Sequence, residues 1–297
     1  MLDSKSLNKL KKDWDTNGFV ILKNSVSKQQ IEILLKNTRR LSNLTDDDYQ
    51  DVIEGKKNHY VNTNQPFIKN KEFWSLVNHE PILNVLRTII GENICYYGAD
   101  SITVHRSATT LHRDSFIDTD NLTGPDFDPN LDELSMVKAA MYLVPNEFIV
   151  VPGSHKKSYP ERDRTIFKEF ADIALMVELN PQDIILFNPM LIHAGRYLTK
   201  PKYMLGWCYA ARNRHTIIGK YYSQIVTSLA INPYDKNFKL FLETNKLYWG
   251  ELYNDKKYIP YFENIWKNMP KHSDIYAKKY LEGVSQRHWS PYQCNLY

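Results

Sequence analysis

Cysteine is scarce in this sequence, and its placement excludes two common uses of the residue. The 297-residue chain has three cysteines, Cys95, Cys208 and Cys294, which lie far apart and form no CxxC pair. An odd number at such spacing indicates neither a disulfide framework nor a zinc site. This usage fits a reducing compartment, and we therefore predict a cytoplasmic protein.

Long apolar runs are also lacking. The N-terminal stretch from Met1 to Leu10 has no apolar core of the kind found in signal peptides. No window reaches the roughly 18 consecutive apolar residues that a membrane-spanning helix needs. The sequence therefore predicts a soluble chain with no membrane span.

Charge of one sign is not concentrated anywhere in the chain. The 38 basic and 34 acidic residues give a net charge of +4, and they are evenly spread. This balance does not indicate a nucleic-acid surface, but it is compatible with a small anionic substrate. A hydrophobic content of 42% with 24% charged residues is that of an ordinary globular protein.

The most informative motif is the triplet His112-Arg113-Asp114. Residues i and i+2 of a strand point to the same face, so His112 and Asp114 can hold one ion together. A lone histidine, His193, follows the distant apolar stretch that begins at Ile185, and a distant ligand of this kind would complete a set of three. Two imidazoles and one carboxylate form the facial site of non-haem Fe(II) oxygenases. The alternative is a hydrogen-bonded polar pair without a metal.

The surrounding pattern predicts a mainly β core with flanking helices. Helices are expected over residues 4–15, 28–42 and 81–90, with Ser27 as an N-cap and Gly91 as a stop signal. Short strands are expected over residues 18–22, 101–106, 136–144, 183–187 and 202–209. Because the strands from about residue 94 to 212 lack intervening helices, they predict an antiparallel sandwich.

Two regions are expected along the chain. Residues 1–214 form a helical N-terminal segment and the β core, and residues 215–297 form a helical, aromatic-rich extension that packs on the core. Tyrosine and tryptophan lie among lysines in this extension. They serve core packing, or they border the active site, or they form the contact of a homodimer.

Several segments, in this order, resemble the phytanoyl-CoA dioxygenase family of Fe(II)- and 2-oxoglutarate-dependent oxygenases. The likeness covers about residues 10–212. It rests on five pieces of sequence: Gly18-Phe19-Val20-Ile21-Leu22, Leu86-Arg87-Thr88-Ile89-Ile90-Gly91, the pair His112 and Asp114, Val151-Pro152-Gly153-Ser154-His155, and Leu191-Ile192-His193-Ala194-Gly195. The resemblance implies a double-stranded β-helix, a jelly-roll or cupin-like fold whose barrel holds the metal.

The resemblance also implies which residues bind the metal. His112, Asp114 and His193 would be the Fe(II) ligands, with 2-oxoglutarate and O₂ as co-substrates. His155 is the rival third ligand, but in the family its Pro-Gly-Ser-His turn is a structural signature. The implied reaction is hydroxylation of a C–H bond with release of succinate and CO₂, and desaturation, ring closure and epimerisation stay open as alternatives. The charge balance adds that the substrate is a small, anionic metabolite.

The sequence departs from the family where the co-substrate should bind. The family places an arginine about ten residues after the distal histidine, where its fork grips the far carboxylate of 2-oxoglutarate. Lys202, which follows Pro201, falls at this position once a shorter loop is allowed for, and Arg196 is the reserve candidate. Lysine keeps the positive charge but lacks the planar bidentate contact.

Two further cations are candidates for substrate binding. Lys138 stands where relatives carry an apolar inward residue, and Arg106 precedes the loop that leads to His112. Either could pair with an anionic group on the substrate, or both could be ordinary surface residues. Two other classes of function remain open: a cupin-like metal protein with redox-neutral activity, and an inactive binding protein.

Overall fold

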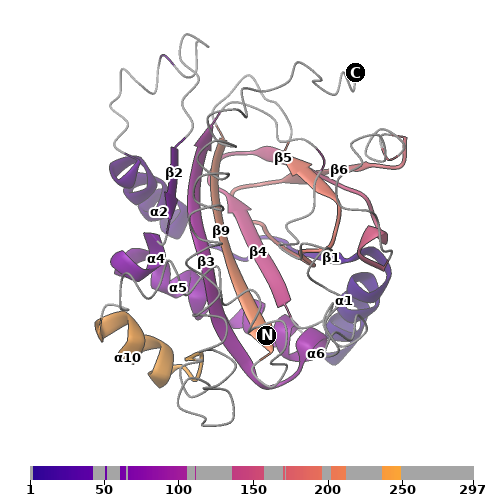
Figure 1. Cartoon of the computed structure of the whole chain (residues 1–297), viewed down its shortest axis with the longest axis horizontal. Coiled ribbons are helices and arrows are strands. Elements are labelled where there is room, and N and C mark those ends of the chain that lie inside the picture. The colour runs from indigo at the N-terminus through magenta and orange to yellow at the C-terminus, as the bar shows by residue number, and fades with distance from the viewer. Residues whose placement is uncertain are drawn as a thin grey trace, which may run out of the picture.

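The architecture is that of a computed structural model of the whole chain (Figure 1). It describes residues 3–42, 51, 61–64, 66–105, 111, 136–156, 170, 172–195, 202–211 and 236–248. His112 and Asp114 lie outside the described ranges, as do Arg106 and Arg196.

The described strands form two sheets, and every pairing in them is antiparallel. The strands are β1 (Phe19–Leu22), β2 (Val61–Asn64), β3 (Ile94–His105), β4 (Met136–Tyr142), β5 (Asn146–Val150), β6 (Leu175–Leu179), β7 (Ile184–Phe187), β8 (His193–Gly195) and β9 (Lys202–Ala211). The larger sheet has the order β1-β7-β4-β9-β3-β2, and the smaller one β6-β5-β8. The predicted antiparallel sandwich is therefore confirmed.

Helices cover the face of the larger sheet that is turned away from the smaller one (Figure 1). They are α1 (Ser4–Asn17), α2 (Lys28–Leu41), α4 (Pro66–Lys69), α5 (Trp74–Val77), α6 (Glu80–Ile90) and α10 (Lys236–Thr244), with 3-10 turns at Lys71–Phe73 and Ser154–Lys156. Within the described ranges, no helix has the length and apolar character needed to cross a membrane.

Alternation along the strands of the larger sheet divides its buried side chains between two clusters. On β9, Tyr203, Leu205 and Trp207 pack with the helices in what we call the helix-side core. Met204 faces the opposite way, toward the apolar cluster between the two sheets, which we call the barrel interior. Its buried members come from both sheets: Ala140, Tyr142, Phe148, Val150, Val177, Leu179, Ile185, Phe187 and Leu191. The period-2 geometry of a strand thus builds both cores from one sequence.

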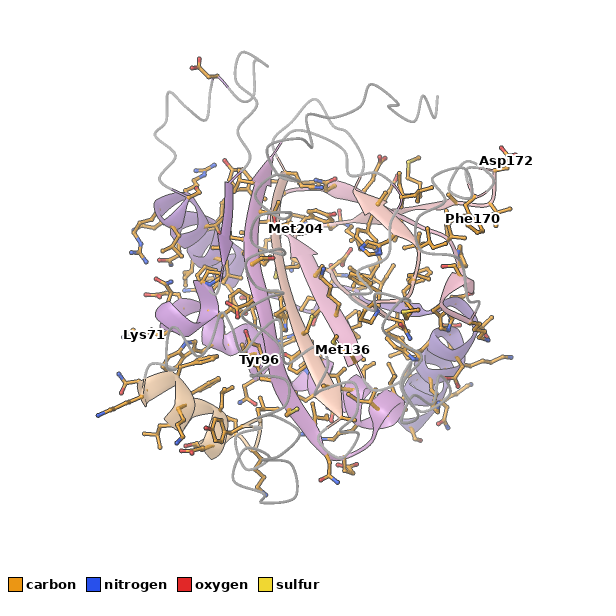
Figure 2. The ribbon with its side chains drawn as sticks, viewed as in Figure 1. Lys71, Tyr96, Met136, Phe170, Asp172 and Met204 are labelled. Carbon is orange, nitrogen blue, oxygen red and sulfur yellow. The ribbon has the colours of Figure 1, made fainter. Side chains whose placement is uncertain are left out.

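The two ends of the larger sheet can be followed in Figure 2. Met204 lies near one end of β9, whereas Met136 and Tyr96 lie near the other. This agrees with the register, in which Met204 is paired with Tyr142 and Met136 with Ala210.

Gly18 ends the first helix rather than beginning the first strand, which corrects the expected strand over residues 18–22. Its φ of +82° is left-handed, and its N–H donates to the carbonyl of Trp14. Glycine adopts this conformation without the steric cost that other residues meet. β1 therefore begins at Phe19.

The other predicted helix signals agree with the structure. The Ser27 hydroxyl accepts a hydrogen bond from the N–H of Gln30 at the start of α2, and α6 ends at Gly91. β3 is longer than the expected 101–106, because its register with β9 shifts between Tyr96 and Gly98 and again before Ser101. Such bulges let one long strand bend with the barrel.

α10 is the described part of the C-terminal extension. Phe238 and Leu242 are buried in the helix-side core. The ring centroid of Phe238 lies 5.4 Å from that of Trp74 and 5.6 Å from that of Tyr96. This helix therefore packs on the face of the large sheet opposite the barrel interior. The rest of the extension, residues 215–235 and 249–297, lies outside the described ranges, so its expected position beside the cavity stays a prediction.

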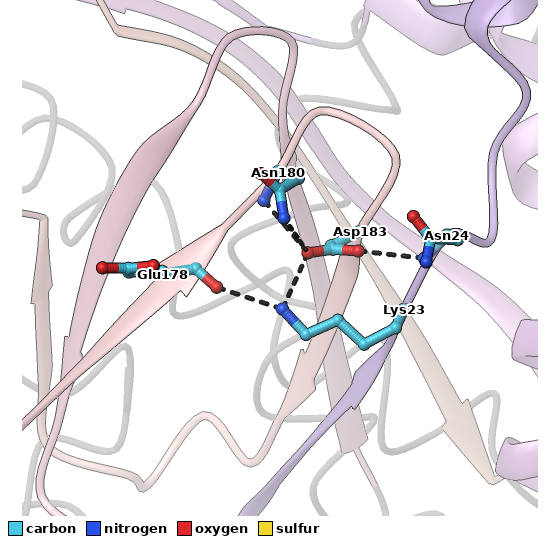
Figure 3. Close-up of polar contacts among 5 residues, drawn as sticks. All are labelled: Lys23, Asn24, Glu178, Asn180 and Asp183. Atoms are coloured by element: carbon cyan, nitrogen blue, oxygen red, sulfur yellow. Dashed lines mark hydrogen bonds and ion pairs between the residues drawn. The ribbon is translucent and has the colours of Figure 1, made fainter.

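A buried carboxylate fixes the turn between β6 and β7 (Figure 3). Asp183 has no exposed side-chain surface, and it accepts hydrogen bonds from Lys23 Nζ at 2.8 Å, the Asn24 N–H at 2.9 Å and the Asn180 N–H at 3.0 Å. Burial alone raises the pKa of Asp183, but these hydrogen bonds outweigh it and hold the pKa below its ordinary value. The turn joins β1, β6 and β7, and so fixes how β7 enters the barrel.

Replacing Asp183 with asparagine should therefore destabilise the fold. One carboxylate oxygen would become an NH₂ group facing donors, which we expect to lower the free energy of unfolding by about 1–3 kcal/mol. The folded-state pKa is depressed, so the contribution is present above the unfolded pKa of about 4 and is lost as pH falls through the folded pKa. Denaturant unfolding at pH 7 and near pH 3 measures both effects.

The matched control is Asp172→Asn, because Asp172 is exposed. This variant should unfold like the wild type at both pH values. Equal stability of Asp183→Asn and wild type at pH 7 would contradict the role assigned to the buried carboxylate.

Candidate active site

His193 opens β8 and points into the barrel interior. It pairs with Val150 of β5, and 4% of its surface is exposed. Its Nδ1 lies 2.8 Å from the carbonyl oxygen of Leu191, so the ring donates its Nδ1 proton to the backbone. The lone pair then lies on Nε2. This is the tautomer and the orientation that a metal-binding histidine takes.

Two phenylalanines hold the His193 ring. Phe148 of β5 stacks on it with the ring centroids 5.3 Å apart, and Phe187 of β7 lies 4.8 Å away at an interplanar angle of 57°. Because these rings come from different sheets, the position of His193 depends on the closed barrel. Their apolar surfaces also restrict water around the imidazole.

The turn over residues 151–156 supports the segment that leads to His193. The Ile192 N–H donates to the Ser154 hydroxyl at 2.8 Å, and the Val151 N–H donates to the Ile192 carbonyl at 2.9 Å. Both bonds end on the residue directly before His193. Ser154 therefore helps to position the imidazole.

His155, the rival ligand, belongs to a different contact. A Cβ added at Gly18 would overlap its imidazole ring, and the Gly153 N–H donates to the carbonyl of Asn17 at 3.0 Å. The two sequence pieces around Gly18 and His155 thus meet at the junction of α1 and β1. This packing gives His155 a structural role.

Leu111 brings the described chain closest to the His112 and Asp114 motif. It is 5% exposed and belongs to a small apolar cluster with Ile192 and Ala194, the two neighbours of His193 in the sequence. The residue that precedes His112 therefore packs beside β8.

Lys202 is the first residue of β9, and it is 3% exposed. It lies two residues before Met204 and on the same face. Its Nζ is 5.9 Å from the ring centroid of Tyr142. Burial lowers the pKa of Lys202 to about 7. Among the described residues, no carboxylate forms an ion pair with this ammonium.

Lys138 also lies on the inner face of the large sheet. Its Nζ is 5.7 Å from the ring centroid of Phe187, which in turn contacts His193. Its Cε lies 3.9 Å from where a Cβ of Gly206 would stand, so the lysine stem crosses β9 over a glycine. The contact with Phe187 brings this cation toward the histidine.

Tyr142 is a candidate site residue that the sequence alone does not single out. It is fully buried in the barrel interior, and its hydroxyl has no hydrogen-bond partner among the described residues. Burial raises the pKa of this phenol, which therefore stays protonated. The sequence does contain a signal for Tyr142, because this residue lies four positions after Lys138 on the same strand and thus on the same face.

Two facing antiparallel sheets around an interior with one buried histidine form a double-stranded β-helix of the jelly-roll type. Solved structures with this fold agree. The chain is similar to the non-heme alpha ketoglutarate dependent epimerase SnoN from nogalamycin biosynthesis, with a TM-score of 0.53, 15% identity, and coverage of 71% of this chain and 85% of that one.

Two further structures are similar to the same extent. HygX from Streptomyces hygroscopicus, with nickel and 2-oxoglutarate bound, has a TM-score of 0.53, 18% identity, and coverage of 71% of this chain and 87% of HygX. The non-heme alpha ketoglutarate dependent carbocyclase SnoK, from nogalamycin biosynthesis, has a TM-score of 0.51, 15% identity, and coverage of 71% and 85%. At these identities the likeness shows the fold alone.

The family is established by sequence. Residues 14–199, more than half of the chain, match the family model described as Phytanoyl-CoA dioxygenase (PhyH). The chain therefore belongs to the phytanoyl-CoA dioxygenase family. Comparison with curated protein sequences gave no match.

Proposed function

We propose that the protein is an Fe(II)- and 2-oxoglutarate-dependent dioxygenase that hydroxylates a small anionic metabolite. The observation that carries the proposal is the shared interior of His193 and Lys202. Lys202 lies against Tyr142, and Tyr142 packs in one cluster with Phe148 and Phe187, which hold His193. A metal-binding nitrogen and a buried cation in one dry barrel suit a chelating dicarboxylate.

His112, Asp114 and His193 would hold the metal. The Nδ1 hydrogen bond of His193 supports Nε2 as the ligand atom. Leu111 packs beside β8, and consecutive Cα atoms are about 3.8 Å apart, which supports a position of His112 close to His193. Bound Fe(II) would supply the redox chemistry that activates O₂.

Lys202 would bind the distal carboxylate of 2-oxoglutarate. An ammonium with no ion-pair partner in the described part of the chain is costly in an apolar interior, and an incoming carboxylate would offset that cost. Arg196 is the alternative anchor. Substitution of Lys202 tests which of these two cations binds the distal carboxylate.

Lys138 and Arg106 would bind an anionic group of the substrate. The Lys138 ammonium lies beside Phe187, the ring that contacts His193, and this supports a substrate held close to the metal. The surrounding phenylalanines would exclude water and pack against the apolar part of the substrate.

In the proposed reaction, 2-oxoglutarate and O₂ are consumed together with a substrate C–H bond. One oxygen atom enters succinate as CO₂ leaves, and the other enters the product as a hydroxyl group. The retained carboxylate of Asp114 favours oxygen transfer over halogenation, because the resemblance associates halogenases with a small residue at this position. Similar folds also serve an epimerase and a carbocyclase. The product therefore has to be identified.

The test is a screen of small anionic metabolites for substrate-dependent succinate formation by the Fe(II)-loaded protein. We expect one succinate per hydroxylated product and incorporation of ¹⁸O from ¹⁸O₂, detected by mass spectrometry. Asp114→Ala is the control without turnover. Turnover without O₂ and 2-oxoglutarate would instead indicate a redox-neutral cupin-like enzyme, and failure to bind any metal would indicate a binding protein.

A further inference from the structure

The Tyr142 hydroxyl is a buried donor in an apolar environment. The side chain has no exposed surface, and its ring packs with Phe148, Phe187 and Met204. The side chains of these neighbours carry no oxygen or nitrogen acceptor, and the hydroxyl has no hydrogen-bond partner among the described residues. Buried hydroxyls in native proteins are almost always paired, so one without a partner suggests a ligand that completes it.

The adjacent strand, β9, provides a second hydrogen-bond donor, the ammonium of Lys202. β4 pairs with β9 so that Tyr142 is opposite Met204, and Lys202 stands two residues before Met204 on the same face. Such a diagonal position is within reach of long side chains. The Lys202 ammonium is 5.9 Å from the Tyr142 ring centroid and 3% of the residue is exposed. Both residues are thus buried near each other on adjacent strands, and neither has an acceptor among the described side chains.

We propose that the Tyr142 hydroxyl donates a hydrogen bond to the carboxylate that Lys202 binds, so that the two side chains together recognise the distal carboxylate of 2-oxoglutarate. This inference rests on the proposed function. A carboxylate has two oxygens, and a lone ammonium offers a point charge without directional pairing. A phenol beside it supplies the second donor and fixes the orientation that a guanidinium fork would otherwise give.

The phenol suits this role chemically. Burial raises its pKa, so the hydroxyl keeps its proton and remains a donor throughout the working pH range. A hydrogen bond from a neutral donor to a carboxylate is one of the stronger kinds in proteins. Tyr142 would therefore be a binding residue for the co-substrate, with no part in metal binding.

The test compares two ligands on Tyr142→Phe. Titration calorimetry is done without O₂, on protein loaded with Ni(II), using 2-oxoglutarate and 2-oxopentanoate, which lacks the distal carboxylate. The variant should bind 2-oxoglutarate roughly tenfold to hundredfold more weakly than wild type, because one charge-assisted hydrogen bond is lost. Its affinity for 2-oxopentanoate should not change.

Tyr203→Phe is the matched control. Tyr203 is also fully buried, but it faces the helix-side core, where its ring lies 5.9 Å from the Arg39 guanidinium. Removing its hydroxyl should leave both affinities at the wild-type value. Tyr142→Met serves as a second variant if phenylalanine gives no folded protein by circular dichroism, and the same selective loss is expected of it.

Wild-type affinity of Tyr142→Phe for 2-oxoglutarate overturns the inference, as does an equal loss for both ligands. In these cases the proposed function stands if the wild type still prefers 2-oxoglutarate to 2-oxopentanoate. A wild type that binds neither ligand, or binds both equally, overturns the proposed function and the inference together.

Discussion

Replacing His193 with alanine is expected to remove metal binding and turnover while the protein remains folded. Two of three predicted ligands would remain, and the metal affinity should fall at least about hundredfold. The imidazole is held between Phe148 and Phe187, so its removal also leaves a small cavity. Anaerobic titration with Fe(II), metal analysis after gel filtration, and circular dichroism measure these effects separately.

His155→Ala is the control for this experiment, because His155 is the other histidine considered as a third ligand. It packs against Gly18, and its loss should lower the thermal stability without changing the metal content. The assignment fails if His193→Ala keeps one iron per chain, and most clearly if His155→Ala loses it.

Replacing Lys202 with methionine should have two opposite effects. The affinity for 2-oxoglutarate should fall at least about hundredfold, since the buried charge that we propose to pair with the carboxylate is lost. In the absence of co-substrate, however, the variant should be more stable than wild type, by about 4 kcal/mol at pH 7. Methionine fills a similar volume without a charge that burial disfavours.

The stability effect has a defined pH dependence. The folded-state pKa of Lys202 is about 7, below the ordinary 10.5, so the unfolded chain binds more protons between these values. Wild-type stability therefore rises with pH across this window, and the advantage of the methionine variant is largest below pH 7 and vanishes towards pH 10.5. Denaturant unfolding of both proteins at pH 6.5 and 9.5 gives the comparison.

Lys202→Arg separates the charge from the geometry of the anchor. It keeps the cation and adds a planar fork, so it should retain 2-oxoglutarate binding where methionine does not. If Lys202→Met binds 2-oxoglutarate with wild-type affinity, another cation holds the carboxylate, and Arg196 becomes the next residue to test.

Most of the architecture could be predicted from local signals in the sequence. Ser27 and Gly91 bound helices as expected, and the strand expected over residues 202–209 is β9. Gly18 was misassigned to a strand, because a glycine between two elements can end one or begin the other. The short helices α4 and α5 have four residues each, too few for a helical period to be recognised.

The site was predictable in part. The histidine and aspartate pattern suggested a metal site, but the sequence does not show whether a lysine at a strand start reaches solvent or the interior. Lys202 is buried because β9 is a central strand, flanked by β4 and β3. The Tyr142 hydroxyl has no partner among the described residues, and this depends equally on contacts between distant strands, which a single sequence does not reveal.

A lysine in place of an arginine at the start of β9 has a consequence for how the protein responds to its surroundings. A guanidinium would be charged at every physiological pH, whereas Lys202, with a pKa of about 7, is charged in only part of the molecules. If it binds the distal carboxylate as proposed, only the protonated fraction is competent, and entry of the co-substrate draws a proton from the medium. Occupancy at a fixed 2-oxoglutarate concentration would then decline as the pH rises above about 7, so that binding of the co-substrate would be coupled to proton uptake.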